Sequence, residues 1–378
     1  MEAGGADRGR ARGFLFSAQG WPYLLTPFIP AAVALELAHA EAGLIFTVAA
    51  VGIIPTAALM GLATEELAAR SGPGIGGLLN VTFGNAPELI IALFALNEGL
   101  HEVVKASIVG SIIGNVLLVL GGSMLVGGLR YRMQHFNATA ANAQSAMLML
   151  AAAALMMPAI FELVEGQGLP SPTAELVDYG STVENLSLAV AIVLIGSYVA
   201  GLVFSLHTHR DIFNPPYAEQ EEEGFGWSVR RSVLMLFIAG LAVGLMSEIL
   251  VGSISEASES VGLSEFFIGV IVVAIVGNAA EHWVAILVAY KNKMDLAVNI
   301  AIGSAAQIAL FVGPVLVIAS FLIGPGPLPL VFNGFELGAV LLAILIANVV
   351  TNDGESNWFE GVQLLALYAI LGIAFFYA

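Results

Sequence analysis

The chain is 378 residues long; 58% of its residues are hydrophobic and only 11% are charged. Soluble domains carry nearer to about 25% charged residues, so this composition excludes an ordinary soluble globular protein. The formal net charge of −17 argues against a broad basic surface for nucleic acid or anionic lipid, and the absence of cysteine excludes disulfides and thiolate metal sites.

Eleven apolar segments lie between polar or Gly/Pro breaks, and each is close to the roughly 20 residues with which a helix crosses a bilayer. The segments lack the two-residue alternation of membrane β-barrels, so the sequence predicts an all-α integral membrane protein. The predicted spans cover residues 22–39, 43–64, 74–97, 103–127, 139–162, 183–206, 228–250, 261–289, 295–323, 329–350 and 358–377.

The basic residues lie almost entirely on one side of these predicted spans. With the N-terminus in the cytoplasm, eleven of the twelve Lys and Arg residues fall on the cytoplasmic side and only Lys105 falls on the other. This distribution follows the positive-inside rule. The first 13 residues carry Arg8, Arg10 and Arg12 without a cleavage site after a short apolar run, so a retained cytoplasmic tail is expected.

One short motif occurs twice in the chain. Residues 84–88 read Gly-Asn-Ala-Pro-Glu, and residues 277–281, at an offset of 193, read Gly-Asn-Ala-Ala-Glu. The pair Gly-Ser at 110–111 recurs at 303–304, at the same offset. Two matched motifs at one offset indicate an internal duplication. In the predicted topology the first copy crosses outward and the second inward, so the two halves are inverted, as in many secondary transporters.

The duplication predicts one leading helix followed by two inverted five-helix repeats. The connection between the halves is acidic and is expected to be either a regulatory segment or a plain charged linker. Its acids are Glu219, Glu221, Glu222 and Glu223. The predicted parts are a cytoplasmic N-terminal tail (1–21), a leading transmembrane helix (22–41), a first repeat (42–206), the cytoplasmic linker (207–227) and a second repeat (228–378).

Each half places one glutamate, Glu88 or Glu281, within an apolar segment. A carboxylate in hydrocarbon is costly, so such residues point to function. Asn85 and Asn278 lie three residues before these acids and share their helix faces. Two carboxylates and two amide oxygens form an oxygen-only ligand set, which is typical of Ca²⁺. Secondary ligand candidates, which could instead serve interhelical hydrogen bonding, are Ser111, Asn115, Ser304 and Gln307.

The same two acids predict proton coupling. Neighbouring buried carboxylates repel each other, and burial disfavours their ionised forms, so the pair is expected to hold protons when no divalent cation is bound. Bound Ca²⁺ would stabilise the ionised forms, and Ca²⁺ and H⁺ would therefore compete for Glu88 and Glu281. His282 directly follows Glu281 and could relay protons or hydrogen-bond between helices.

The motifs at residues 84–90 and 277–282, with the paired Gly-Ser segments, resemble the cation/proton exchanger branch of the calcium/cation antiporter superfamily. The resemblance spans essentially the whole chain after the N-terminal tail. It implies Ca²⁺/H⁺ antiport by alternating access, with Glu88 and Glu281 as the exchange site, assisting asparagines and a regulatory acidic linker. Pro87 is a departure, because this branch usually has a residue such as Thr or Val there, and Ala-Pro-Glu resembles the sodium/calcium exchanger branch.

The nearest alternative is Na⁺-coupled Ca²⁺ exchange on the same fold. A cation channel would need a continuous pore, which suits an inverted repeat with buried acids less well. No zinc-protease, nucleophile-elbow or Walker motif occurs, so an enzyme is not expected. The predicted partners are Ca²⁺, H⁺ and the lipid bilayer, without a cofactor or nucleic acid and with homo-oligomerisation left open. The expected location is a prokaryotic plasma membrane, with the N-terminus in the cytoplasm.

Overall fold

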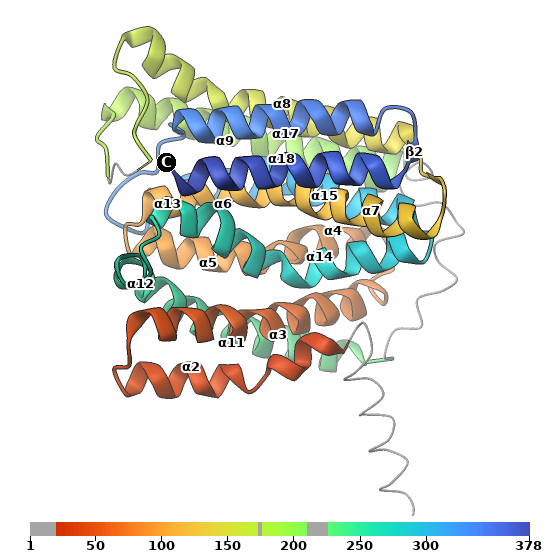
Figure 1. Cartoon of the computed structure of the whole chain (residues 1–378), viewed down its shortest axis with the longest axis horizontal. Coiled ribbons are helices and arrows are strands. Elements are labelled where there is room, and N and C mark those ends of the chain that lie inside the picture. Colours follow the sequence, from red (N-terminus) through yellow and green to blue (C-terminus); the bar gives the residue numbers. More distant parts are fainter. Residues whose placement is uncertain (1–19, 173–175, 210–225) are drawn as a thin grey trace, which may run out of the picture.

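The computed structural model describes residues 20–172, 176–209 and 226–378, whose helices run side by side in one bundle (Figure 1). The first half contains η1 (Trp21–Leu25), α2 (Phe28–Leu37), α3 (Ala42–Ala68), α4 (Gly72–Gly84), α5 (Ala86–Asn97), α6 (His101–Ile113), η2 (Gly114–Val119), α7 (Leu120–Arg130), β1 (Gln134–His135), α8 (Ala138–Glu165), α9 (Gly180–Val203) and η3 (Phe204–Thr208). The second half contains α11 (Val229–Gly252), α12 (Ile254–Val261), α13 (Glu265–Phe267), η5 (Ile268–Val273), α14 (Ala274–Tyr290), α15 (Met294–Gln307), η6 (Ile308–Val312), α16 (Gly313–Ala319), α17 (Gly334–Val350), β2 (Glu355–Ser356) and α18 (Trp358–Phe376).

The prediction of a helical membrane protein is confirmed. Among the described residues, eight continuous helices are long and apolar enough to cross a membrane, or nine if the bent pair α4–α5 counts as one span. Two shorter apolar helical segments cover Trp21–Leu37 and Gly334–Val350. Every predicted span overlaps a helix, while the number of eleven crossings stays a prediction.

Two predicted spans differ from the observed helices. The span predicted for 74–97 is interrupted at Asn85, where α4 and α5 meet at an angle of 43°. Pro87 lacks a backbone N–H, which favours the start of a helix over its continuation. The span predicted for 329–350 begins only at Gly334, because Asn333 caps α17 by accepting a hydrogen bond from the backbone N–H of Glu336.

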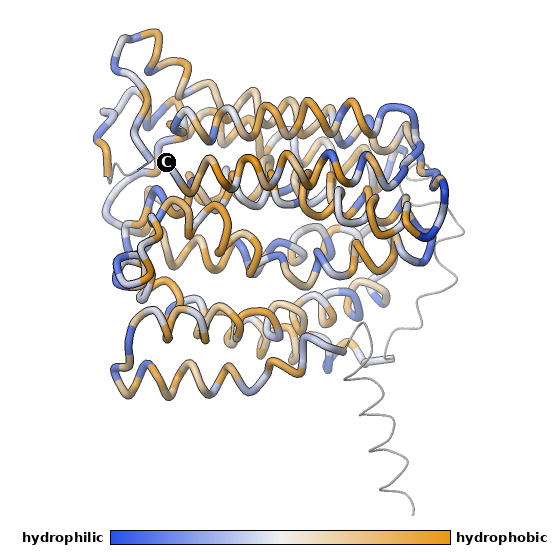
Figure 2. Tube along the Cα trace, in the orientation of Figure 1, coloured by the Kyte–Doolittle hydropathy of each residue, from blue (hydrophilic) through white to orange (hydrophobic). Residues whose placement is uncertain are grey.

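The two ends of the bundle differ in charge. Of the eight Lys and Arg residues in the described ranges, all but Lys105 lie at the end formed by the C-termini of α3, α7 and α14 and the N-terminus of α11, on the right in Figure 1. We call this the basic end. The far end carries the connections 38–41, 98–100, 253–264 and 320–333. Hydrophilic residues gather in the connections, and apolar residues dominate the helices between them (Figure 2).

The two helices that carry the Gly-Ser pairs are the most buried spans. In the continuous helix His101–Arg130, 94% of an apolar stretch of 18 residues is buried. The corresponding share in the helix Met294–Ala319 is 78%. Both helices contain a π-helical segment just after the Gly-Ser pair, η2 in the first half and η6 in the second. Segments of this kind are rare in proteins, and those that occur are often found at functional sites. The two halves therefore share a local irregularity of the helix as well as a sequence motif.

Two short strands that are far apart in the sequence pair with each other at the basic end. Strands β1 and β2 pair antiparallel, with Gln134 opposite Ser356. The buried side chain of Gln134 donates to the carbonyl of Ala289 at 2.9 Å and to Asn292 Oδ1 at 3.0 Å. The two hydrogen bonds of Gln134 connect the α7–α8 connection to the α14–α15 connection. The helices that carry the two Gly-Ser pairs are therefore linked at this end.

Candidate cation-binding site

The two motif glutamates lie at the centre of the bundle in different local structures. Glu88 is in the first turn of α5, directly after the break at Asn85. A helix N-terminus favours negative charge, so this break offsets part of the cost of an ionised Glu88. Glu281 lies in the middle of the unbroken helix α14. The interpretation that each asparagine shares a helix face with its acid therefore holds only for the second half, because Asn85 is the junction itself.

The motif glycines make room for the opposite glutamate. A Cβ atom on Gly84 would lie 3.4 Å from Oε1 of Glu281, and a Cβ atom on Gly277 would lie 3.3 Å from Cγ of Glu88. Each half thus presents a bare backbone surface to the acid of the other half. Each acid thus lies where the two halves of the chain contact each other.

The motif serines and asparagines also pair across the two halves. The Ser304 hydroxyl lies 2.9 Å from Asn85 Oδ1 and can donate to it, and Asn278 Nδ2 donates to the Ser111 hydroxyl at 3.2 Å. These two contacts join equivalent positions of the repeats in opposite order. The Ser304 hydroxyl also lies 3.3 Å from Oε2 of Glu281, which connects the serine–asparagine pair to one of the acids.

Three acceptor oxygens in this region are buried without a hydrogen-bond partner among the described residues: Oδ1 of Asn115, Oδ1 of Asn278 and Oε2 of Glu88. The amide nitrogens of both asparagines are engaged, Asn278 with Ser111 and with the carbonyl of Ala274, and Asn115 with Ser304 at 3.4 Å. Leaving a buried acceptor unpaired costs about 1–3 kcal/mol. Such unpaired oxygens are candidate ligands for a bound cation, and an oxygen-only donor set fits Ca²⁺.

Asn85 and Gln307 form a different arrangement. Asn85 Nδ2 donates to Gln307 Oε1 at 2.7 Å, while its own Oδ1 accepts from Ser304. Both ends of the Asn85 amide are therefore engaged within the protein. Gln307 has no equivalent glutamine or asparagine in the first half, where position 114 is glycine, so this hydrogen bond breaks the symmetry of the site.

His282 stands apart from this network. Its Nε2 atom is buried and has no hydrogen-bond partner in the described part of the chain. Its role in proton coupling stays a prediction.

The acidic linker lies outside the described residues, which resume at residue 226, so the structure does not describe its acids Glu219, Glu221, Glu222 and Glu223. Just beyond them, the backbone N–H of Trp227 donates to buried Glu66 at 2.9 Å, which fixes the end of the linker to α3.

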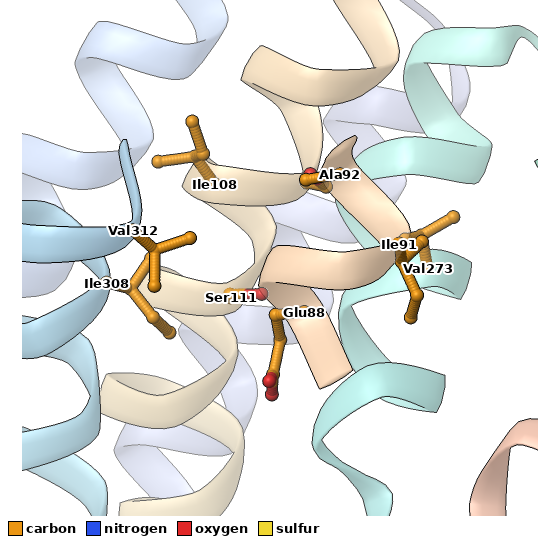
Figure 3. Close-up of a pocket in the computed structure, with 9 residues that line it drawn as sticks. Glu88, Ile91, Ala92, Ile108, Ser111, Val273, Ile308 and Val312 are labelled. Atoms are coloured by element: carbon orange, nitrogen blue, oxygen red, sulfur yellow. The ribbon is translucent and has the colours of Figure 1, made fainter. Parts of the chain in front are cut away.

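A pocket borders Glu88 (Figure 3) and extends toward the far end, because Ala92 and Ile108 lie nearer than Glu88 and Ser111 to the connection 98–100. Figure 3 shows the Glu88 side chain extending away from Ala92 and Ile108, with Ser111 close by. The pocket is lined by Glu88, Ile91, Ala92, Ser107, Ile108, Ser111, Val273, Ile308 and Val312. Glu281 instead lies within electrostatic range of Glu65, in the last turns of α3 at the basic end. Apart from Glu88, Ser107 and Ser111 the lining of this pocket is apolar, whereas the charged neighbour of Glu281 lies toward the basic end.

No group of three or more His, Asp or Glu side chains placed to hold a metal ion occurs in the described ranges. A cation at the centre would therefore depend on two carboxylates and on neutral oxygens.

A cluster missed by the sequence interpretation lies at the far end and contains Lys105, Glu102 and Glu336. Its signal in the sequence is Lys105, which is the single basic residue on that side.

Comparison with known proteins identifies relatives over nearly the whole chain. The family model described as sodium/calcium exchanger protein matches residues 42–207 and 231–377. The Ca²⁺/H⁺ antiporter ChaA of Bacillus subtilis (strain 168) is 48% identical over 356 residues, which cover 93% of this chain and 97% of the relative. A Ca²⁺/H⁺ antiporter of Synechocystis sp. is 46% identical over 353 residues, which cover 88% of this chain and 91% of the relative.

Solved structures agree with this assignment. Native YfkE superimposes with a TM-score of 0.79 at 44% sequence identity, over 94% of this chain and 100% of that chain. The H⁺/Ca²⁺ exchanger CAX shares the fold, with a TM-score of 0.66 at 15% identity over 96% of this chain and 93% of that chain. The resemblance indicated by the doubled motif is confirmed: the chain belongs to the sodium/calcium exchanger protein family and is a membrane transporter rather than an enzyme.

Proposed function

We propose that this protein exchanges Ca²⁺ for H⁺ across the membrane, with Glu88 and Glu281 binding either the cation or protons. The observation that carries the proposal is that each acid lies beside the motif glycine of the other half, in a region where buried oxygens of Asn115 and Asn278 have no hydrogen-bond partner among the described residues. Relatives named as Ca²⁺/H⁺ antiporters at 48% and 46% identity support this choice of ions.

We propose that the exchange proceeds by alternating access, and the position of the two acids between the halves of the chain supports this mechanism. The pocket at Glu88 lies toward the far end, whereas Glu281 is near Glu65 toward the basic end. Inverted repeats of a transporter exchange their conformations, so the site at their interface is reached from one side at a time. In this proposal Ca²⁺ enters when both acids have released their protons, and protons displace it after the site has opened to the other side.

Sidedness and domain organisation belong to this proposal as well. The family match to residues 42–207 and 231–377 supports repeats at 42–206 and 228–378, with a leading helix before the first. The basic end would face the cytoplasm, because seven of the eight described Lys and Arg residues lie there. In a prokaryotic plasma membrane the inward proton gradient would then drive export of Ca²⁺.

Reconstituted vesicles with an acidic interior test the proposed exchange. External Ca²⁺ should accumulate as protons leave, and a sodium gradient imposed in place of the proton gradient should give no accumulation. Uptake driven only by sodium would keep the calcium site but assign the coupling to Na⁺. Absence of uptake under both gradients would overturn the proposal.

The amide oxygens at the centre should set the affinity for Ca²⁺. We expect Asn278→Ala to raise the KM for Ca²⁺ by about 10-fold, because removing one neutral ligand costs about 1–2 kcal/mol. Asn352→Ala, which changes an exposed asparagine in the turn after α17, serves as the control and should leave KM unchanged. An unchanged KM for Asn278→Ala in initial-rate transport assays would remove Asn278 from the ligand set.

A further inference from the structure

A second buried cluster of charged side chains lies at the far end of α6. The ammonium of Lys105 is only 1% exposed; it forms a 2.6 Å ion pair with Oε1 of Glu102 and donates to the carbonyl of Val331 at 2.9 Å. A buried ammonium is costly unless it is paired, so this contact fixes the start of α6 to the connection before α17.

Glu336 adds a second acid to this cluster. Its Oε2 accepts from the backbone N–H of Asn333 at 2.8 Å, as part of the capping box of α17. Its side chain lies within electrostatic range of both Lys105 and Glu102. The other oxygen, Oε1 of Glu336, is buried without a hydrogen-bond partner in the described part of the chain, and so is Oε2 of Glu102.

The charges of these three side chains do not balance. Two carboxylates and one ammonium leave a net charge of −1 in a buried place, which a bound proton neutralises. The same neighbourhood contains His101, Glu162 and the hydroxyl of Tyr179. Burial and the neighbouring carboxylates Glu102, Glu162 and Glu336 raise the pKa of Tyr179, so its phenol stays protonated and adds no further negative charge.

The cluster is connected to the central site through α6. Lys105 and Ser111 are six residues apart on this helix, a rise of about 9 Å. Ser107 and Ile108, which lie between them, both line the pocket beside Glu88. Ile108 also lines a second pocket that borders Glu336, so the two pockets share a lining residue on α6. The surroundings of Glu336 and of Glu88 are therefore neighbours along this helix.

The duplication places a related acid at the other end. Glu102, in the first turn of α6, corresponds to Asp295, in the first turn of α15, at the offset of 193. Asp295 is exposed at the basic end and accepts from the backbone N–H of Asn137. Each Gly-Ser helix thus begins with an acid at its own end of the bundle, and the central acids lie between them.

We propose that Glu336 and Glu102, held by Lys105, form a second proton-binding cluster that passes protons between the far end and Glu88. A proton from water at the far end binds one carboxylate of the cluster and moves to Glu88 when the central site opens toward that end. The inference rests on the proposed Ca²⁺/H⁺ exchange. It assigns a proton-positioning role to residues that do not touch the transported Ca²⁺.

Two transport modes of the full-length protein in vesicles distinguish a proton relay from a structural role. Exchange of external radioactive Ca²⁺ for internal Ca²⁺ needs the central site and alternating access but no net proton movement. Ca²⁺/H⁺ exchange needs the central site, alternating access and net proton movement. We expect Glu336→Gln to slow Ca²⁺/H⁺ exchange by at least about 10-fold, most strongly at alkaline pH, and to leave Ca²⁺/Ca²⁺ exchange unchanged. Glutamine can still serve the capping box, so α17 should begin at the same residue.

Glu360→Gln is the matched control. Glu360 occupies the same capping-box position in α18, with Asn357 as its partner, but α18 begins at the basic end. This variant should leave both modes unchanged. If Glu336→Gln does not accumulate, Glu102→Gln is measured in the same two modes. Equal losses in both modes, or no loss in either, would overturn the relay, while a wild-type protein without proton-driven uptake would instead overturn the proposed function.

Discussion

Replacing either central acid with glutamine is expected to abolish proton-driven Ca²⁺ transport. Glu88→Gln and Glu281→Gln keep the size of the side chain but remove a charge that the bound cation needs. Removing one member of a buried charge interaction costs about 3–5 kcal/mol, so the affinity for Ca²⁺ should fall by more than about 100-fold. Initial rates of Ca²⁺ uptake into vesicles with an acidic interior measure the effect.

The control for this experiment is an acid elsewhere in the chain. Glu355→Gln changes an acid in the short strand β2 at the basic end, away from the central helices, and should transport like the wild type. The two central variants should also elute as folded protein in detergent, because glutamine fills the same space. Substantial proton-driven uptake by Glu88→Gln or Glu281→Gln would contradict the shared-ligand account.

Gly110→Ala is expected to prevent stable folding. A Cβ atom at this position would lie 2.0 Å from the carbonyl oxygen of Val270, where α6 packs directly on the backbone of η5. Overpacking a well-ordered core typically costs about 1–3 kcal/mol, and a clash with backbone atoms cannot be relieved by a rotamer change, so the cost here should reach or exceed that range. We expect little folded protein after purification, and a lower thermal midpoint in detergent for the part that survives.

Two neighbouring alanine variants show whether this effect is local. A Cβ atom on Gly114, one turn later on the same helix, would meet no atom within 4 Å. On Gly303, which is the equivalent of Gly110 in the second half, a Cβ atom would meet its nearest neighbour only at 3.5 Å. Both variants should keep a thermal midpoint close to that of the wild type. A stable, well-expressed Gly110→Ala would show that the close contact of α6 with η5 is not required.

The central acids could be found from the sequence because the duplication marked them. Glu88 and Glu281 stand at equivalent places in apolar segments that carry few other charges. The cross-pairs Ser304–Asn85 and Ser111–Asn278 were out of reach, because they depend on how the two halves pack. A motif shows which residues are related by symmetry, but it does not show that a serine of one half contacts the asparagine of the other.

Local signals were present for some of the missed features. The sequence Asn-x-x-Glu at 333–336 is the signature of a capping box and marks the start of α17, later than the apolar pattern alone suggests. Pro87 marks the break at Asn85. The ion pair of Lys105 with Glu102 joins residues three apart on one helix and was also visible. The arrival of Glu336 beside them is a tertiary contact that no local pattern predicts.

The count of protons released when Ca²⁺ binds tests the central claim most directly. Purified protein in weakly buffered detergent solution is titrated with Ca²⁺ while a pH indicator records the protons released. If Ca²⁺ and H⁺ share Glu88 and Glu281, binding should release up to two protons, and the affinity for Ca²⁺ should rise with pH by up to about 100-fold per unit. Glu88→Gln and Glu281→Gln should each release fewer protons. Tight Ca²⁺ binding with no proton release, and with an affinity that does not change with pH, would contradict the account.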